Sequence, residues 1–455
     1  MSAEALGVGT AEGKGAGAPP PRLRRSLTYY DLLIYGLAYV SPFAPLQTLG
    51  FVWKASNGLI VLAYILGAVC MYFTAKSYAM MTQTVTTAGS VYGFARHALG
   101  PFTGFIAGWM VLLDYLLIPA YIYVLMAVAM ADLIPQVGLA VWIVLLCSVT
   151  LGVNWFGVTV TSRVNLVSVA LQVFFLVGLL ILAGLALHAG LGTGGLTLKP
   201  VYSRDLFHAG AIFSATSICV MSFLGFDAVS TLSEEVKGDD KRVMGRAIVG
   251  VLVLSASLFA LVAWVLGNLL SGFTFKDDAA AMYELAAWAI GPWAGITLAW
   301  VQAIVVGFTN ALPMQVGVAR VLFAMGRDKQ LPTALSTLHP KYGTPYIGMV
   351  LTTGISLAVA LAMRFKMDEL VSLVNFGALT AFVLLHVSVI VTFWVRGRSG
   401  RWVLHLVVPV TGIVIVLAVI SGMSPLAMRL GITWLIAGLC YALILRKRAR
   451  APLAL

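Results

Sequence analysis

The sequence predicts an all-α membrane protein with twelve transmembrane helices. Of the 455 residues, 60% are hydrophobic and only 10% are charged, and the mean hydropathy is +0.97. Apolar runs long enough to cross a bilayer alternate with short polar stretches, so no second, soluble domain fits. Windows of about 19 residues place the spans near 29–53, 58–80, 102–131, 139–156, 164–188, 209–232, 247–271, 291–317, 346–363, 370–395, 403–421 and 429–446.

The net charge of +12 is distributed as in a membrane protein rather than as in a nucleic-acid-binding protein. If the N-terminus is cytoplasmic, 22 of the 29 lysines and arginines fall on the cytoplasmic side and 7 on the other. This positive-inside pattern predicts that both termini are cytoplasmic. We expect 1–25 to be a disordered cytoplasmic N-terminus and 447–455 a cytoplasmic tail. The lipid bilayer is therefore the expected partner, and nucleic acid is not.

The residues that carry enzymatic chemistry form no recognisable motif in this chain. The four cysteines all lie within predicted spans, and their spacing matches neither a metal site nor a disulfide framework. The six histidines are scattered and do not form a zinc site. The sequence thus predicts a protein that is not an enzyme and that holds no metal and no organic cofactor.

Two of the predicted spans contain residues that weaken a helix. The first contains Gly36, Ser41 and Pro42, and the sixth contains the run 222–226 with Gly225 inside it. Backbone groups that are freed inside a bilayer persist only where they line a cavity or meet a ligand. Because the breaks are five spans apart, they predict two inverted repeats of five helices, an architecture of transporters. The expected boundaries are 26–446 for the membrane domain, about 29–188 and 209–395 for the repeats, and about 403–446 for two further helices.

Asp114 and Asp227 lie deep inside the third and sixth spans, and neither span contains a lysine or arginine. An unpaired charge near the bilayer centre costs about 2.5–3.5 kcal/mol, so such residues usually face a cavity or a ligand pathway. A diamine would neutralise both carboxylates, whereas an α-amino acid would add a third negative group. The methylene groups of a diamine would then pack against Tyr39, Phe223 and Phe226. Protonation of one aspartate would instead admit a neutral or cationic amino acid, and this alternative stays open.

Several stretches distributed along the chain carry a family resemblance. They read TAGSVY at 87–92, SFLGFDAVSTLSEE at 222–235, RVLFAMGRDKQLP at 320–332 and NFGAL at 375–379. Together they resemble the amino acid–polyamine–organocation (APC) superfamily of transporters. Within that superfamily, GLAYVSP at 36–42, LLDYLLIP at 112–119 and FKDDAA at 275–280 are similar to segments of bacterial putrescine importers.

The resemblance implies a LeuT-like fold, with broken helices one and six, and secondary active transport. It implies that putrescine or a similar diamine or polyamine is imported across the bacterial cytoplasmic membrane by alternating access. The alternative is an amino acid permease of the same superfamily, and a remote alternative is a transporter-like nutrient sensor. The residues expected to bind substrate are Asp114, Asp227, Tyr39, Ser41, Phe223, Gly225, Phe226, Asn310 and Asn375, and those expected to break the helices are Gly36, Pro42 and Ser222.

Two positions depart from the pattern of the superfamily. Relatives that carry amino acids usually have a glycine-rich first break, whose N–H groups hold the substrate carboxylate. Here Ala38, Tyr39 and Ser41 follow Gly36. Several relatives carry a lysine in the fifth span that stands in for a coupling sodium ion, and the matching position here is Gln172. Gln172 thus marks the expected coupling-ion position, but a neutral amide cannot act as the lysine does. A proton or a sodium ion remains the possible coupling ion.

Overall fold

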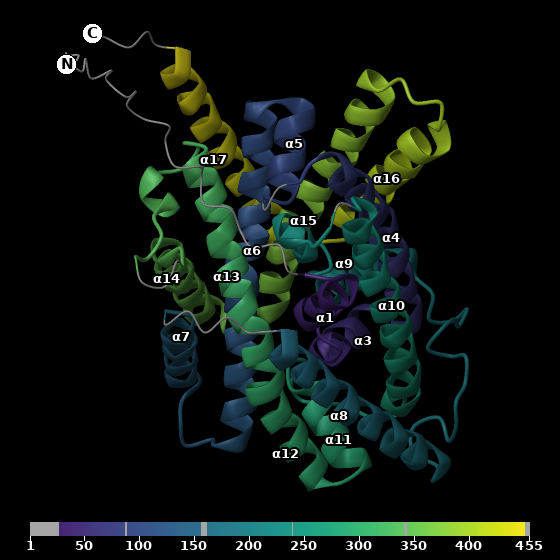
Figure 1. Cartoon of the computed structure of the whole chain (residues 1–455). Helices are drawn as coiled ribbons and strands as arrows, with labels where there is room; N and C mark the ends of the chain where they lie inside the picture. The colour runs from purple at the N-terminus through teal and green to yellow at the C-terminus, as the bar shows by residue number, and fades with distance from the viewer. Residues whose placement is uncertain (1–26, 87–88, 156–161, 239, 341–343, 451–455) are drawn as a thin grey trace, which may run out of the picture.

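The structure, a computed structural model, describes residues 27–450 with gaps at 87–88, 156–161, 239 and 341–343. Within these residues the chain is built from α-helices with a few short 3₁₀- and π-helical segments (Figure 1). The one β-type pairing in this part of the chain is an isolated parallel bridge between Leu27 and Val236. The expected N-terminal segment 1–25 and the last five residues of the expected tail lie outside the described residues.

The helices follow one another along the chain with short connections. The α-helices are α1 (Tyr29–Val40), α2 (Ala44–Gln47), α3 (Leu49–Ala55), α4 (Ile60–Thr84), α5 (Val91–Leu99), α6 (Pro101–Leu133), α7 (Leu139–Trp155), α8 (Ser162–His188), α9 (Ala209–Phe223), α10 (Arg242–Leu270), α11 (Ala281–Ala289), α12 (Pro292–Trp300), α13 (Gly307–Arg327), α14 (Tyr346–Met363), α15 (Met367–Val389), α16 (Val408–Ser421) and α17 (Pro425–Arg450). The 3₁₀-helical segments are η1 (Ala228–Glu235) and η3 (Thr333–Ser336), and the π-helical segments are η2 (Val301–Val306), η4 (Ile390–Arg396) and η5 (Val403–Val407).

The described helices make the chain a multi-pass membrane protein of the all-α class, as the sequence predicts. Ten helical runs are long and apolar enough to cross a membrane, and the bent pair at the start of the chain raises this number to eleven. The helix α7 has 17 residues and is shorter, but it lies where the fourth span was expected.

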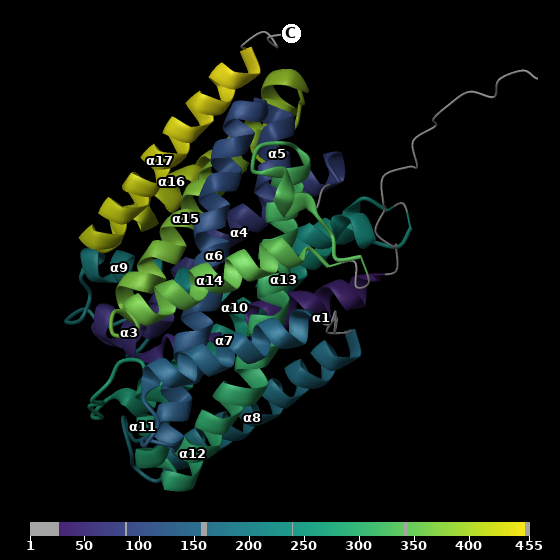
Figure 2. The same ribbon diagram turned by 90° about the vertical axis from the view of Figure 1, so that its left-hand side faces the viewer.

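The helix α6 forms the centre of the bundle. It is apolar on all sides, and 94% of its most hydrophobic stretch is buried, as expected for a helix enclosed by others. It packs against α5, α7, α13, α14, α15 and α17. Figure 2 shows α16 and α17 on the outside of the bundle, and their exposed apolar side chains suit contact with lipid. We call the two ends of the bundle in Figure 1 the α5 end, which also holds the C-terminal end of α17, and the α11 end.

The first span is broken between α1 and α3. The helix α1 begins at a capping box, in which Thr28 and Asp31 satisfy each other's backbone N–H groups. It ends before Ser41, which has a φ of 64°, a left-handed conformation that few residues other than glycine adopt. Pro42 lies within this break, and the chain bends by 57° where α3 begins.

The sixth span is broken at the end of α9. The helix ends at Phe223, the turn 224–227 follows, and the chain continues as the 3₁₀-helix η1. Within the turn, Gly225 has a φ of 111°, which only glycine adopts without strain.

Both breaks therefore start later in the sequence than predicted. Gly36 lies within α1, so the prediction that it breaks the helix is wrong. A Cβ at Gly36 would collide with Val251 of α10 and Val229 of η1, so this glycine allows close packing instead. Ser222 is also helical, because it belongs to the last turn of α9, and its hydroxyl group bonds to neighbouring elements.

Candidate functional site

The two helix breaks are in direct contact with each other. A Cβ at Gly225 would lie 2.9 Å from both the carbonyl carbon and the carbonyl oxygen of Tyr39. The absence of a side chain at Gly225 thus allows the turn after α9 to rest on the backbone of α1. The end of α1 and the end of α9 meet at this point, in the middle of the bundle (Figure 1).

A small cavity of about 30 Å³, which we call the central cavity, lies at the junction of the two breaks. The polar residues that line it are Tyr39, Gln47, Thr48, Tyr121, Ser222 and Asn310. One water molecule needs about 10–15 Å³ of such space. The central cavity therefore has room for one or two small groups, and a whole diamine or amino acid requires its walls to move.

Hydroxyl and amide groups join the helices around the central cavity. The Oγ1 of Thr48 lies 2.7 Å from the hydroxyl group of Tyr64 and 3.0 Å from the Oγ of Ser222. The Nε2 of Gln47 donates to the Oε1 of Gln302 at 3.3 Å. These bonds link the broken first span to α4, α9 and η2, so the break is held by its neighbours rather than by its own backbone.

Asp227 lies in the turn between α9 and η1, where its side chain is 1% exposed. Its Oδ2 accepts hydrogen bonds from the hydroxyl groups of Tyr115 at 3.1 Å and Tyr78 at 3.3 Å. Its Oδ1 accepts a bond from the backbone N–H of Gly225 at 3.2 Å. These three donors fix the orientation of the carboxyl group.

Asp114 lies in α6 and is also 1% exposed. Its Oδ1 has no hydrogen-bond partner among the residues that the structure describes. The next residue, Tyr115, bonds to Asp227, and the two carboxyl groups are close enough to interact electrostatically. The structure thus brings together the two aspartates that the sequence singled out, and we call them the acid pair.

No basic side chain compensates the acid pair. None of the lysine and arginine side chains in the described part of the chain is buried. His386 is buried, but its ring contacts Ser77 at 2.8 Å and Thr74 at 3.4 Å. Among the described residues, no group of three or more His, Cys, Asp or Glu could hold a metal ion. A buried pair of carboxyl groups without a cation can be neutralised by a cationic ligand.

The two phenylalanines expected at the site have different surroundings. Phe226 packs against Tyr78 beside the acid pair, with the ring centroids 6.0 Å apart. Phe223 points instead toward Phe259 of α10, with the ring centroids 5.1 Å apart, and it does not line the central cavity. Packing between helices explains the position of Phe223.

Two further predicted residues contact the broken helices. The side-chain amide of Asn375 in α15 donates to the backbone carbonyl of Ser217 in α9. The Oγ of Ser41 donates to the Oε1 of Gln172 in α8 at 2.8 Å and accepts a bond from the backbone N–H of Phe43 at 3.2 Å. Gln172 therefore supports the unusual backbone of the first break directly.

Other residues of the site were not predicted from the sequence. Tyr115 could have been found, because it directly follows Asp114. Tyr121 lies two helical turns after Asp114 on the same face of α6, which is a weaker signal of the same kind. Tyr78 and Gln47 carry no local signal, since only the packing of α4 and α2 brings them to the site.

Comparison with known proteins identifies this arrangement. The family model described as amino acid permease matches residues 32–444. The chain belongs to the amino acid permease family. It is 31% identical over 437 residues to the low-affinity putrescine importer PlaP of Escherichia coli (strain K12), a match that covers 94% of this chain and 95% of the relative.

Two relatives from Bacillus subtilis (strain 168) are more distant. The branched-chain amino acid permease BcaP is 27% identical over 396 residues, and the methylthioribose transporter is 27% identical over 395 residues. Each match covers 81% of this chain and 81% of the relative. The resemblance to the APC superfamily is thereby confirmed, and the chain is a transporter rather than an enzyme.

The permease is closed at its α5 end. The carboxylate of Glu235 at the end of η1 forms an ion pair with Arg320 of α13 at 3.3 Å. The backbone N–H of Leu27 donates to the carbonyl of Glu235 at 3.0 Å, and that of Lys237 donates to the carbonyl of Leu27 at 2.9 Å. The inner halves of both broken spans are therefore joined to each other and to α13.

A second set of contacts lies near the first. Arg96 of α5 forms an ion pair with Asp328, which follows α13. The hydroxyl group of Tyr92 donates to the same carboxylate at 2.6 Å. Burial raises the pKa of Tyr92, which keeps this hydroxyl group protonated and able to donate.

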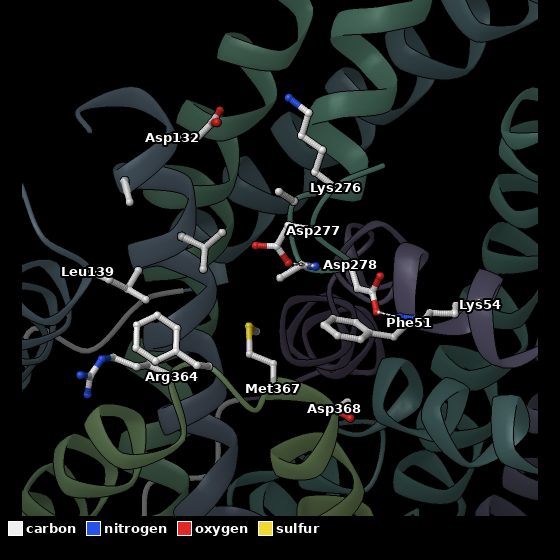
Figure 3. Close-up of a pocket in the computed structure, with 15 residues that line it drawn as sticks. Phe51, Lys54, Asp132, Leu139, Lys276, Asp277, Asp278, Arg364, Met367 and Asp368 are labelled. Carbon is white, nitrogen blue, oxygen red and sulfur yellow. Dashed lines mark hydrogen bonds and ion pairs between the residues drawn. The ribbon is translucent and has the colours of Figure 1, made fainter. Parts of the chain in front are cut away.

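The permease is hollowed at its α11 end. A space of about 610 Å³, which we call the vestibule, lies between α3, the end of α6, the segment before α11 and the start of α15 (Figure 3). The charged residues that line it are Lys54, Asp132, Lys276, Asp277, Asp278, Arg364 and Asp368. Lys54 and Asp278 form an ion pair at 3.2 Å. Phe51 lines the vestibule and Thr48 lines the central cavity, so one turn of α3 separates the two spaces.

Proposed function

We propose that this permease imports putrescine or a similar diamine or polyamine by alternating access. The observation that carries the proposal is the acid pair, which is buried and has no basic partner among the described residues. A dication supplies two positive charges to two carboxylates. An α-amino acid brings a carboxylate of its own, for which the described site offers no basic group.

The ends of the broken helices also favour a cation. The helices α1 and α9 both end at the central cavity, so both direct their C-terminal ends toward it. A helix C-terminus carries about half a negative charge and has carbonyl groups without a partner in the helix. Two such ends stabilise an ammonium group between them and disfavour a carboxylate.

The relatives support a transporter of small nitrogen compounds and leave an alternative. The importer PlaP, whose name specifies putrescine, matches nearly the whole chain. The permease BcaP, whose name specifies branched-chain amino acids, supports the alternative that this chain carries a neutral or cationic amino acid. A transporter-like nutrient sensor is the remote alternative, and it would bind its ligand without moving it.

The proposed orientation follows from the distribution of charge. The positive-inside pattern assigns the α5 end to the cytoplasm and both termini with it. The membrane is then the bacterial cytoplasmic membrane, with twelve spans arranged as two inverted repeats and two additional helices. In this orientation the structure is closed toward the cytoplasm, and the vestibule faces outward.

The membrane potential suffices to drive uptake of a dication. Each positive charge that moves inward gains about 2.3 kcal/mol per 100 mV, hence roughly 4.6 kcal/mol for two charges. At about 1.36 kcal/mol per factor of ten, this allows accumulation of more than a thousandfold without a coupling ion. Symport with a proton or a sodium ion is compatible with the proposal, and Gln172, a neutral amide, supports no lysine-type coupling.

Uptake of radiolabelled putrescine into a bacterial strain that lacks its own putrescine transport tests the proposal. We expect saturable uptake that other diamines inhibit and leucine does not. Saturable uptake of leucine without competition by millimolar putrescine would favour the amino acid permease instead. Binding of putrescine without any flux would favour the sensor.

A further inference from the structure

We propose that the central cavity is the subsite for the second amine of the substrate, with Asn310 as the residue that recognises it. This inference rests on the proposed function, in which the acid pair receives the first amine. It adds a specificity-determining residue and a length requirement to that site.

The first step is the state of the Asn310 side chain. Asn310 lies in α13, lines the central cavity and is only 4% exposed. Its Oδ1 has no hydrogen-bond partner among the described residues. A buried amide oxygen without a donor destabilises the protein, so this oxygen favours a ligand that can donate a hydrogen bond. An ammonium group has three N–H donors, and rotation of the amide can present the oxygen to it.

The second step is the size and charge of the central cavity. Its volume of about 30 Å³ accepts one amine but not the carbon chain that carries it. The described residues that line it include no charged side chain, and its other polar groups are hydroxyl groups and the amide of Gln47. The site thus accepts a single positively charged group, whose carbon chain must extend toward the acid pair.

The third step is the distance from the acid pair. Asp114 and Ile118 lie four residues apart in α6 and therefore on the same face, and Ile118 lines the central cavity. Four residues of α-helix rise about 6 Å. The two nitrogens of putrescine are separated by five bonds, roughly 6 Å when the chain is extended. One turn of α6 therefore matches the length of a four-carbon diamine.

The backbone contact between the breaks connects the two subsites. Tyr39 lines the central cavity, and its backbone touches Gly225. The N–H of Gly225 in turn donates to Asp227 of the acid pair. A diamine that spans both subsites thus contacts both broken helices, whereas a monoamine engages only the acid pair with its charge.

Binding measurements on the purified full-length protein test the inference. We would measure the affinity for putrescine and for butylamine, which lacks the second amine, in the wild type and in Asn310→Leu. A lost hydrogen bond to a charged group should weaken putrescine binding by about tenfold or more, and butylamine binding by less than about twofold. The control is Thr309→Val, which removes a hydroxyl group that bonds to the backbone of its own helix and leaves both affinities unchanged.

The outcomes separate the inference from the proposed function. Absence of putrescine binding by the wild type overturns both. Putrescine binding by the wild type, combined with an equal effect of Asn310→Leu on both amines or no effect on either, overturns only the inference. If Asn310→Leu does not fold, the isosteric Asn310→Asp decides. We expect the added carboxylate to raise the affinity ratio of putrescine to butylamine, and an unchanged or lower ratio contradicts the inference.

Discussion

Replacement of Asp227 by Asn tests the role of the acid pair with little change in shape. Both oxygens of Asp227 accept hydrogen bonds, from Tyr78 and Tyr115 on one side and from Gly225 on the other. The substitution removes one negative charge and turns one acceptor into an NH₂ group that faces a donor. A bound ammonium group then lacks half of the charge that neutralises it.

The magnitude follows from the burial of the pair. Loss of one partner of a buried charge pair costs about 2–5 kcal/mol, which corresponds to a roughly thirty- to five-thousandfold weaker affinity. We expect this loss for putrescine in Asp227→Asn and a similar loss in Asp114→Asn. Tyr115→Phe is the matched control, because it removes one hydrogen bond to Asp227 and keeps the charge. A neutral hydrogen bond contributes about 0.5–1.5 kcal/mol, so this variant should lose about tenfold at most.

Isothermal titration calorimetry of purified variants with putrescine measures these affinities, and thermal unfolding shows whether each variant is folded. Folded Asp114→Asn and Asp227→Asn proteins that bind putrescine with wild-type affinity would refute the reasoning. The aspartates would then be structural or would carry protons. A loss in Tyr115→Phe as large as that in Asp227→Asn would show that hydrogen bonding, not charge, dominates.

Two further predictions concern the breaks and the closed end. Gly225→Ala places a Cβ against the backbone of the first break at a φ of 111° and should destabilise the protein by about 1–3 kcal/mol in thermal unfolding; Gly210→Ala, in the same helix with nothing within 4 Å of its Cβ, is the control and should be neutral. Glu235→Gln removes the partly exposed ion pair with Arg320, worth about 1 kcal/mol or less, and should increase thiol labelling of a cysteine introduced at Ser230 by up to about fivefold. Unchanged labelling would mean that this ion pair does not hold the α5 end closed.

The sequence was sufficient to predict the spans and the acid pair. Hydropathy depends on local composition, so the apolar runs correspond to the helices found. Asp114 and Asp227 stood out because an unpaired carboxylate in a span is rare. Their proximity could not be derived from the sequence, because it depends on how α6 packs against the turn after α9.

The positions of the breaks depend on contacts that are distant in the sequence. Gly36 weakens a helix in isolation, but in the protein it allows α10 to approach α1. Ser41 adopts a left-handed conformation although it is not glycine, and its hydroxyl group is bonded to Gln172, which is 131 residues away. No local pattern predicts such a bond. Phe223 was expected at the substrate for its aromatic character, yet the packing of α9 directs it toward α10.

Transport by the purified protein in liposomes tests the central claim most directly. The liposomes would carry an imposed membrane potential, negative inside, with no pH or sodium gradient, and radiolabelled putrescine would be supplied outside. We predict that putrescine accumulates inside above its external concentration, that collapse of the potential abolishes the accumulation, and that Asp227→Asn shows little uptake. Accumulation of leucine but not of putrescine, or binding of putrescine without entry, would contradict the account.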